Sequence, residues 1–294
     1  TDKHLQTLQA QFALAQQQGM PAPLQQSLQA TFNSLQKLGD TRAAASGLSI
    51  PAPEAAAYFT QTIAAVLANI PAITEQTSNL TLIKRMTAYL AYLHAKERTG
   101  QERALMVPVF TADNIEPAQY RNFIGHMAAQ QAYLSTFQGY ASDGILTQHS
   151  KNTSNDTAQA VEAMRKTVID KVATGQFGIE PTQWFKAITA KINDMHAVEN
   201  ALSSEIKNAA STLANQAYRH MLLSSALSSL LLLATLALAW WMARSIITPV
   251  NALRDAMIRI EQDKDLTREI QVEGDDELAH VAKAFNRLTA SLRQ

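Results

Sequence analysis

The chain has 294 residues, of which 47% are hydrophobic, and this is ample for a large core. Lysine plus arginine and aspartate plus glutamate each total 25, so the formal net charge is zero and the basic footprint of nucleic-acid binding is absent. The chain has no cysteine, which excludes disulfides and thiolate metal sites. Its seven histidines form no HxxxH pair, so we expect neither a metal site nor another cofactor.

The residues before Met221 carry apolar side chains at helical spacing, without a convincing stretch of the alternation that marks a strand. Prolines and glycines divide this part into six or seven helical segments, because they remove a backbone donor or add backbone freedom. The breaks fall at 19–23, 46–54, 71, 111–117, 142–144 and 175–181. Long helices with short connections fold back on their neighbours, so the sequence predicts an all-α fold of up-and-down bundles.

A helix predicted over 75–107 contains an unusual apolar seam. The seam Met86, Leu90, Leu93, continued in steps of three and four, reaches Glu97 and Gly100. A carboxylate and a glycine then stand where apolar side chains are expected. Because a glycine inside a helix costs about 1 kcal/mol relative to alanine, Gly100 predicts the close approach of another backbone or a ligand.

Basic side chains surround the same stretch, at Lys96, Arg98 and Arg103. They favour an anion-binding site on this helix. The alternative is a solvated face on which Arg98 and Glu102 form an ordinary i,i+4 ion pair, worth a few tenths of a kcal/mol.

The following helices supply candidate core positions. Four aromatic residues at helical spacing are expected to be buried: Tyr120, Phe123, Tyr133 and Phe137. Gln130 and Gln131 are interpreted as capping or surface residues, with the lining of a polar pocket as the alternative. The last helix begins near Pro181 and meets no breaker before the apolar run that follows, so it could carry a displacement along the chain. Five of its side chains fall near one face: Trp184, Ile188, Ile192, Met195 and Leu202.

An uncharged run extends from Met221 to Ala243 and ends with Trp240, Trp241 and Arg244. As a helix it is ~34 Å long, which is enough to cross a hydrocarbon core of about 30 Å at a tilt. Paired tryptophans followed by an arginine are typical of a membrane interface.

The run therefore predicts a transmembrane helix over 219–244, between a helical domain at 1–218 and a second domain at 245–294. We also expect a first membrane helix upstream of Thr1 and further chain after Gln294.

Two apolar stripes at coiled-coil spacing follow the apolar run. The first is Val250, Leu253, Met257 and Ile260, and the second is Leu278, Val281, Phe285, Leu288 and Leu292. Each stripe is too short to be stable alone, so a partner helix is required. The charged connector over 261–276 carries Leu266, Ile270 and Val272, which can pack onto the helices.

The segments ITPVNALRDAM, DLT and GDDELAHVAKAFNRL resemble a HAMP domain, with Pro249 and Glu277 at its best-marked positions. The resemblance implies a parallel homodimeric four-helix coiled coil that relays signals from a membrane helix to a cytoplasmic output domain, such as a chemotaxis domain, a histidine kinase or a cyclase. It also implies that residues after Arg244 are cytoplasmic. The first domain would then be periplasmic, on a protein of the bacterial inner membrane.

The segments KERTGQERALM at 96–106 and YRNFIGHMAAQQAYLSTF at 120–137 resemble the NIT domain, and the resemblance covers roughly 36–202. It implies helical bundles packed side by side that sense nitrate or nitrite. The family carries an arginine near the end of an early helix, and its counterpart here is Arg42 in LQKLGDTRAAA. The predicted ligand-binding residues are therefore Arg42, Arg98 and Arg103.

The chemistry fits, because the guanidinium fork matches two oxygens of a planar anion. Nitrate has four heavy atoms, so at about 1.5 kcal/mol for each its dissociation constant is limited to roughly tens of micromolar. A carboxylate or amino acid receptor and a membrane scaffold that only binds proteins are the alternatives. The sequence shows no catalytic constellation, so we expect no enzyme activity.

Overall fold

The structure, a computed structural model, describes residues 2–17, 19–263, 269–271 and 277–292. Throughout these ranges the chain forms helices, turns and loops and no strand, which confirms the all-α prediction. The helices are α1 (Asp2–Gln17), α2 (Ala22–Leu35), α3 (Leu38–Ser46), α4 (Ala52–Leu67), α5 (Asn69–Thr74), α6 (Leu80–Ala112), α7 (Pro117–Tyr140), α8 (Asp143–Thr153), α9 (Asp156–Asp170), α10 (Pro181–Met242), the π-helix η1 (Ala243–Ile247), α11 (Thr248–Asp263) and α12 (Glu277–Leu292). They form two units, Thr1–Thr212 and Leu213–Gln294.

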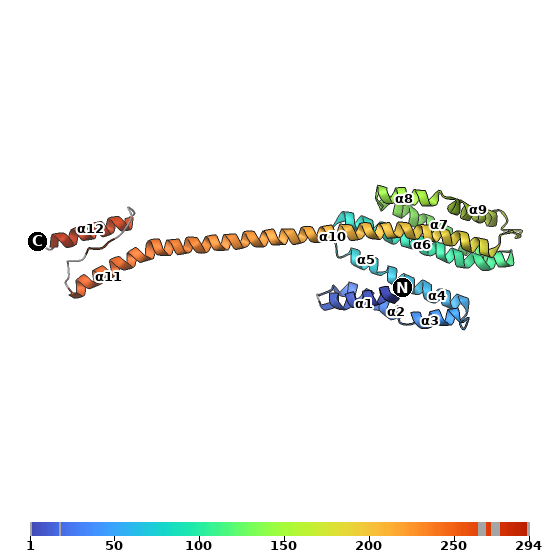
Figure 1. The fold of residues 1–294 in the computed structure, drawn as a ribbon, viewed down its shortest axis with the longest axis horizontal. Helices are drawn as coiled ribbons and strands as arrows, with labels where there is room; N and C mark the ends of the chain where they lie inside the picture. The colour runs from blue at the N-terminus through green and yellow to red at the C-terminus, as the bar shows by residue number, and fades with distance from the viewer. Residues whose placement is uncertain (1, 18, 264–268, 272–276, 293–294) are drawn as a thin grey trace. The chain divides into compact units, whose positions relative to one another are not determined.

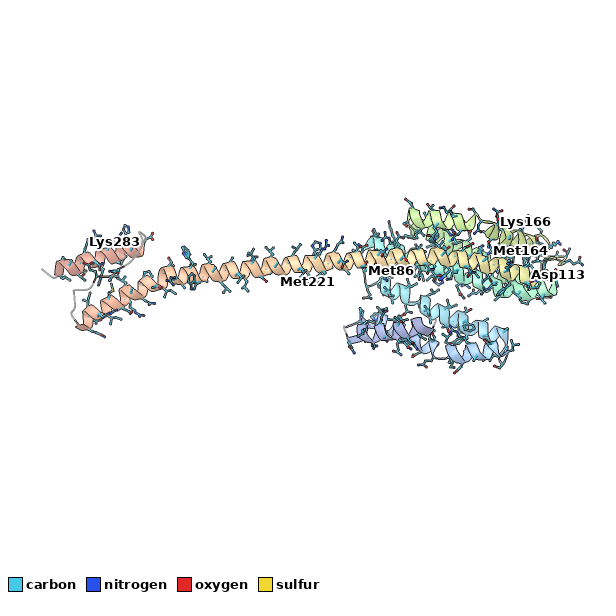
Figure 2. All side chains as sticks on the ribbon, in the orientation of Figure 1. Met86, Asp113, Met164, Lys166, Met221 and Lys283 are labelled. Atoms are coloured by element: carbon cyan, nitrogen blue, oxygen red, sulfur yellow. The ribbon has the colours of Figure 1, made fainter. Side chains whose placement is uncertain are left out.

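The predicted breaks separate helices except at Pro71, which lies inside α5, and α6 has different ends from those predicted. It begins at Leu80 rather than Glu75, because the side chain of Asn79 accepts a hydrogen bond from the Leu82 amide at 2.9 Å and caps the helix. It continues through Pro108 and ends where Asp113 takes a left-handed conformation, at φ 50°. Figure 2 shows Asp113 at the end of the bundle, where α6 turns towards α7.

The first helices, α1 to α5, form a group of their own (Figure 1). The rings of Phe12 and Phe32 lie 5.0 Å apart between α1 and α2. Buried Asn69 donates to the Thr31 hydroxyl at 2.7 Å and accepts from the Ser27 hydroxyl at 2.8 Å, which joins α5 to α2. Polar contacts between α2 and α5 thus supplement a small apolar core.

The helices α6 to α9 and the first part of α10 lie side by side in a second group, here called the sensor bundle (Figure 1). Two apolar clusters fill it, one centred on Phe110, Phe123 and Trp184 and the other on Tyr92 and Phe137. The predicted apolar face of α10 is confirmed, because Trp184, Ile188, Met195 and Leu202 are buried and Ile192 packs beside them. Among the four predicted core aromatics, Phe123 and Phe137 are fully buried, and Tyr120 and Tyr133 pack against the clusters.

Helix α10 continues without a break to Met242, as the absence of a breaker predicts. Its apolar run is exposed on all sides in this unit, with Leu223 69% and Trp240 65% exposed. Two helical stretches of the described chain are long and apolar enough to cross a membrane by length and composition: Pro181–Gln262, which contains the predicted run, and Ala52–Thr74. Helix η1 follows, and the guanidinium of Arg244 lies 5.7 Å from the Trp240 ring.

The predicted packing of the connector holds at Ile270, which is 8% exposed. Asn286 of α12 accepts a hydrogen bond from the Ile270 amide at 2.9 Å and donates one to its carbonyl at 3.0 Å. The other connector positions, Leu266 and Val272, lie outside the described residues. In this single chain the apolar stripes remain open, since Met257 and Leu288 are 48% and 57% exposed.

Candidate functional site

The buried face of α6 differs from the predicted seam. It includes Tyr92, Thr99, Glu102 and Met106, all fully buried. Glu97, the carboxylate that the predicted seam placed inside, is only partly buried and accepts a hydrogen bond from Gln101 at 2.9 Å. The carboxylate in the core of this helix is therefore Glu102, five positions further on.

The prediction of a close backbone approach at Gly100 is wrong. A Cβ atom built at Gly100 would meet nothing within 4 Å beyond its own helix, so the glycine leaves an open position. The alternative pairing of Arg98 with Glu102 is wrong as well. Arg98 donates to Gln101 at 2.8 Å, and Glu102 pairs with Arg165 of α9.

Arg103 is attached to α10. Its Nη1 donates to the Thr189 hydroxyl at 3.0 Å, and its guanidinium lies 5.0 Å from the Phe185 ring centre. Trp184 donates from Nε1 to the backbone carbonyl of Arg103 at 3.3 Å. Any ligand that moves the Arg103 guanidinium must therefore exchange contacts with α10.

The three predicted arginines occupy different positions. Arg98 and Arg103 share α6, but five residues of helix separate their directions by about 140°, and they contact different partners. Arg42 lies on α3, which packs against α4, and is partly buried. The structure does not join Arg98 and Arg103 into one clamp.

A buried polar network occupies the middle of the sensor bundle. Glu102 is fully buried, and Arg165 binds both of its carboxylate oxygens through one edge of the guanidinium, from Nε at 2.7 Å and from Nη2. Gln130 completes the network by donating to Glu102 at 2.6 Å and accepting from Arg165 at 2.8 Å. Bidentate arginine–carboxylate contacts of this kind are both strong and geometrically specific. The surface interpretation of Gln130 was therefore wrong, and its pocket alternative is correct.

This network borders a cavity of about 620 Å³ among α6, α7, α8, α9 and α10. The lining residues are Tyr92, Thr99, Ile124, Met127, Ala128, Gln130, Gln131, Leu134, Gln138, His149, Asn152, Thr153, Ala158, Glu162, Arg165, Lys191, Asp194 and Met195. Burial, with a contribution from the charge of Arg165, lowers the pKa of Lys191. Burial likewise lowers the pKa of His149, whose Nδ1 lies 3.4 Å from the Tyr92 hydroxyl.

Along the chain, a helical bundle with a buried polar centre is followed by a long helix and then by α11 and α12. The chain belongs to the NIT family, nitrate and nitrite sensing, whose model matches residues 1–207. The match is longer than the resemblance over 36–202. A HAMP domain model matches residues 241–294, which confirms that resemblance too. Both are sensing or signalling domains.

Two individual proteins are similar to this chain. The nitrate regulatory protein of Klebsiella oxytoca is 24% identical over 164 residues, which are 56% of this chain and 41% of that protein. The structure of the NasR transcription antiterminator matches with a TM-score of 0.65 and 23% identity, over 72% of this chain and 57% of that one. The chain thus spans about half the length of these relatives, and the structural likeness shows a shared fold.

Proposed function

We propose that this chain is a bacterial membrane receptor that binds nitrate or nitrite in the periplasm and transmits the binding event through its HAMP domain. The observation that carries the proposal is the order of parts along one chain. The NIT match ends at 207, the HAMP match begins at 241, and α10 runs unbroken between them from Pro181 to Met242. The output would be a cytoplasmic chemotaxis or kinase domain.

The proposed membrane segment is 219–244, with the sensor domain at 1–218 on one side and 245–294 on the other. The exposed leucines of this segment support it, since lipid is the solvent in which such a surface is stable. The open stripes on α11 and α12 support a homodimer, because two chains would cover them in a four-helix coiled coil.

The proposed ligand contacts are Arg42, Arg98 and Arg103, and Arg103 is the one tied to α10. Nitrate bound to Arg103 would change the contact between its guanidinium and Thr189, and this change would act on α10. A ligand shifts such an equilibrium only by its difference in affinity for the two states.

Calorimetric titration of the full chain with nitrate, in detergent, tests the anion site. We expect a dissociation constant of roughly tens of micromolar for the parent chain. Arg103→Ala should weaken binding at least about tenfold, because each charge-assisted hydrogen bond contributes about 1.5–3 kcal/mol. Arg42→Ala is expected to act in the same direction, and Arg98→Ala should have a smaller effect than Arg103→Ala because the two side chains point about 140° apart on α6.

Arg121 is an exposed arginine of α7, so Arg121→Ala is the matched control and should bind nitrate like the parent. A folded parent chain that gives no heat at millimolar nitrate contradicts the proposal. Competition by acetate at equal concentration would instead favour a carboxylate receptor.

The membrane segment has its own test. Leu232→Arg places a charge at the middle of the apolar run, where arginine costs about 2.5–3.5 kcal/mol of insertion free energy. The parent chain should stay with the membrane fraction after alkaline carbonate extraction, and the variant should be recovered partly in the supernatant. Leu48→Arg, at an 89% exposed position of the first unit, is the control and should behave like the parent. Complete extraction of the parent itself would show that this run does not span a bilayer.

A further inference from the structure

The cavity of the sensor bundle has the size and composition of a ligand site. Its volume of about 620 Å³ falls within the range of roughly 300–1,000 Å³ that small-molecule pockets occupy. Five helices contribute to its wall, including α10. Exposed side chains of α7, among them Ile124, Gln131 and Gln138, are part of the lining, so the cavity reaches the surface along this helix.

The charges on the wall disfavour a small anion. Arg165 is already matched by Glu102 through one edge of its guanidinium, Nε and Nη2, and by Glu162 through Nη1 at 2.7 Å. Lys191 is matched by the same Glu162 at 3.2 Å, and Asp194 is the second carboxylate of the lining. Two cations and two carboxylates therefore line the cavity, and both cations are already paired. Nitrate entering here would add a negative charge without a free cation to balance it.

The same wall offers both a hydrogen-bond donor and a hydrogen-bond acceptor to a ligand. The ammonium group of Lys191 has three donors and uses one of them on Glu162. The carboxylate of Asp194 accepts from the Asn155 amide at Oδ2, at 2.7 Å, and a carboxylate can accept further hydrogen bonds at its other oxygen. Lys191 and Asp194 lie three residues apart on α10, so one turn of helix presents a donor and an acceptor on one side.

The remaining wall is apolar. Ile124, Met127 and Leu134 from α7 and Met195 from α10 line it beside the charged residues. The cavity therefore offers an ammonium group, a carboxylate and an apolar surface to one occupant.

We propose that this cavity is a second ligand site, distinct from the predicted arginines, and that it binds an α-amino acid with an apolar side chain. The ligand carboxylate accepts from Lys191, the ligand ammonium donates to Asp194, and the side chain lies against the methionines and Leu134. A zwitterion adds no net charge, and it supplies a partner to each unfilled group on the wall. Because both polar contacts are on α10, binding acts directly on the helix that leaves the bundle.

The test is calorimetric titration of the full chain in detergent with L-leucine, L-methionine, L-valine and L-phenylalanine at up to millimolar concentration. We expect saturable binding of at least one of them. For leucine, the matched analogues are isoamylamine, which lacks the carboxylate, and isocaproate, which lacks the ammonium group. Each should bind at least about tenfold more weakly than leucine, since each loses one charge-assisted contact.

Lys191→Met and Asp194→Asn should each weaken amino acid binding at least about tenfold and leave nitrate binding unchanged. Lys166→Met is the matched control, because Lys166 projects from α9 into solvent and pairs only with exposed Asp170 in the described chain (Figure 2). Far-UV circular dichroism verifies that each variant keeps its helices.

The proposal is overturned if the parent chain gives no heat of binding with any of the four amino acids. It is also overturned if isocaproate binds as tightly as leucine. Unchanged binding in folded Asp194→Asn overturns it too. Because nitrate is titrated separately, failure here is distinguishable from failure of the anion site.

Discussion

Replacing Glu102 with alanine is expected to destabilise the sensor bundle by about 3–5 kcal/mol, because it leaves a buried arginine without its counter-charge. Arg165 is 8% exposed and directs its Nε and Nη2 at this carboxylate. Gln130 would lose its acceptor at the same time. Urea unfolding followed by far-UV circular dichroism measures the change as a lower midpoint at an unchanged slope.

Two further variants separate burial from charge in this network. Glu162→Ala removes the other carboxylate bound to Arg165, but its side chain is 56% exposed, so the expected cost is about 0–1 kcal/mol. The double variant Glu102→Leu with Arg165→Met replaces the buried pair by apolar groups and should recover most of the loss, as buried ion pairs elsewhere are often replaced at little cost. A Glu102→Ala variant no less stable than Glu162→Ala would show that the network is solvated.

Much of the helical organisation follows from the sequence because its signals are local. Proline and glycine act within a few residues of backbone, so most breaks between helices can be predicted from them, although Pro71 and Pro108 lie inside helices. The apolar face of α10 is also local, since large side chains such as Trp184 and Ile188 repeat at helical spacing. Breaks without proline or glycine are harder to predict from the sequence. One of them separates α8 from α9, where the Asn155 side chain caps α9.

The seam of α6 was predicted wrongly for a different reason. Periodicity gives weight to large apolar side chains, and these led from Leu90 and Leu93 to Glu97. The buried face instead uses small residues, Ala88, Ala91 and Ala95, which let neighbouring helices approach closely. Alanine is common on exposed helix faces as well, so its burial is decided by what packs against the helix.

The candidate site depends on contacts that no local pattern contains. Glu102 meets Gln130 and Arg165 across 28 and 63 residues of chain. Each of the three reads alone as an ordinary polar residue of a helix surface. Only the packing of α6, α7 and α9 makes them one network. The family resemblance pointed to α6 through KERTGQERALM, but it assigned Glu102, the carboxylate beside Arg103, no role.

Replacing Trp184 with alanine is the second change with a large expected effect, a loss of about 3–5 kcal/mol in the free energy of unfolding. Trp184 is fully buried in the first turns of α10, its ring centre lies 5.4 Å from that of Phe110, and its Nε1 donates to the Arg103 carbonyl. The truncation therefore opens a void and removes one of the hydrogen bonds between α6 and α10.

The adjacent residue provides the control for Trp184→Ala. Phe185 is 50% exposed and lies beneath the Arg103 guanidinium, so Phe185→Ala should cost only about 0.5–1 kcal/mol from the lost cation–π contact. Urea unfolding of both variants, in the same detergent as the parent, gives the comparison. Similar midpoints for the two would mean that the junction of α6 and α10 does not depend on the buried indole. A large difference would identify Trp184 as a side chain that fixes α10 to α6, the helix that carries Arg103.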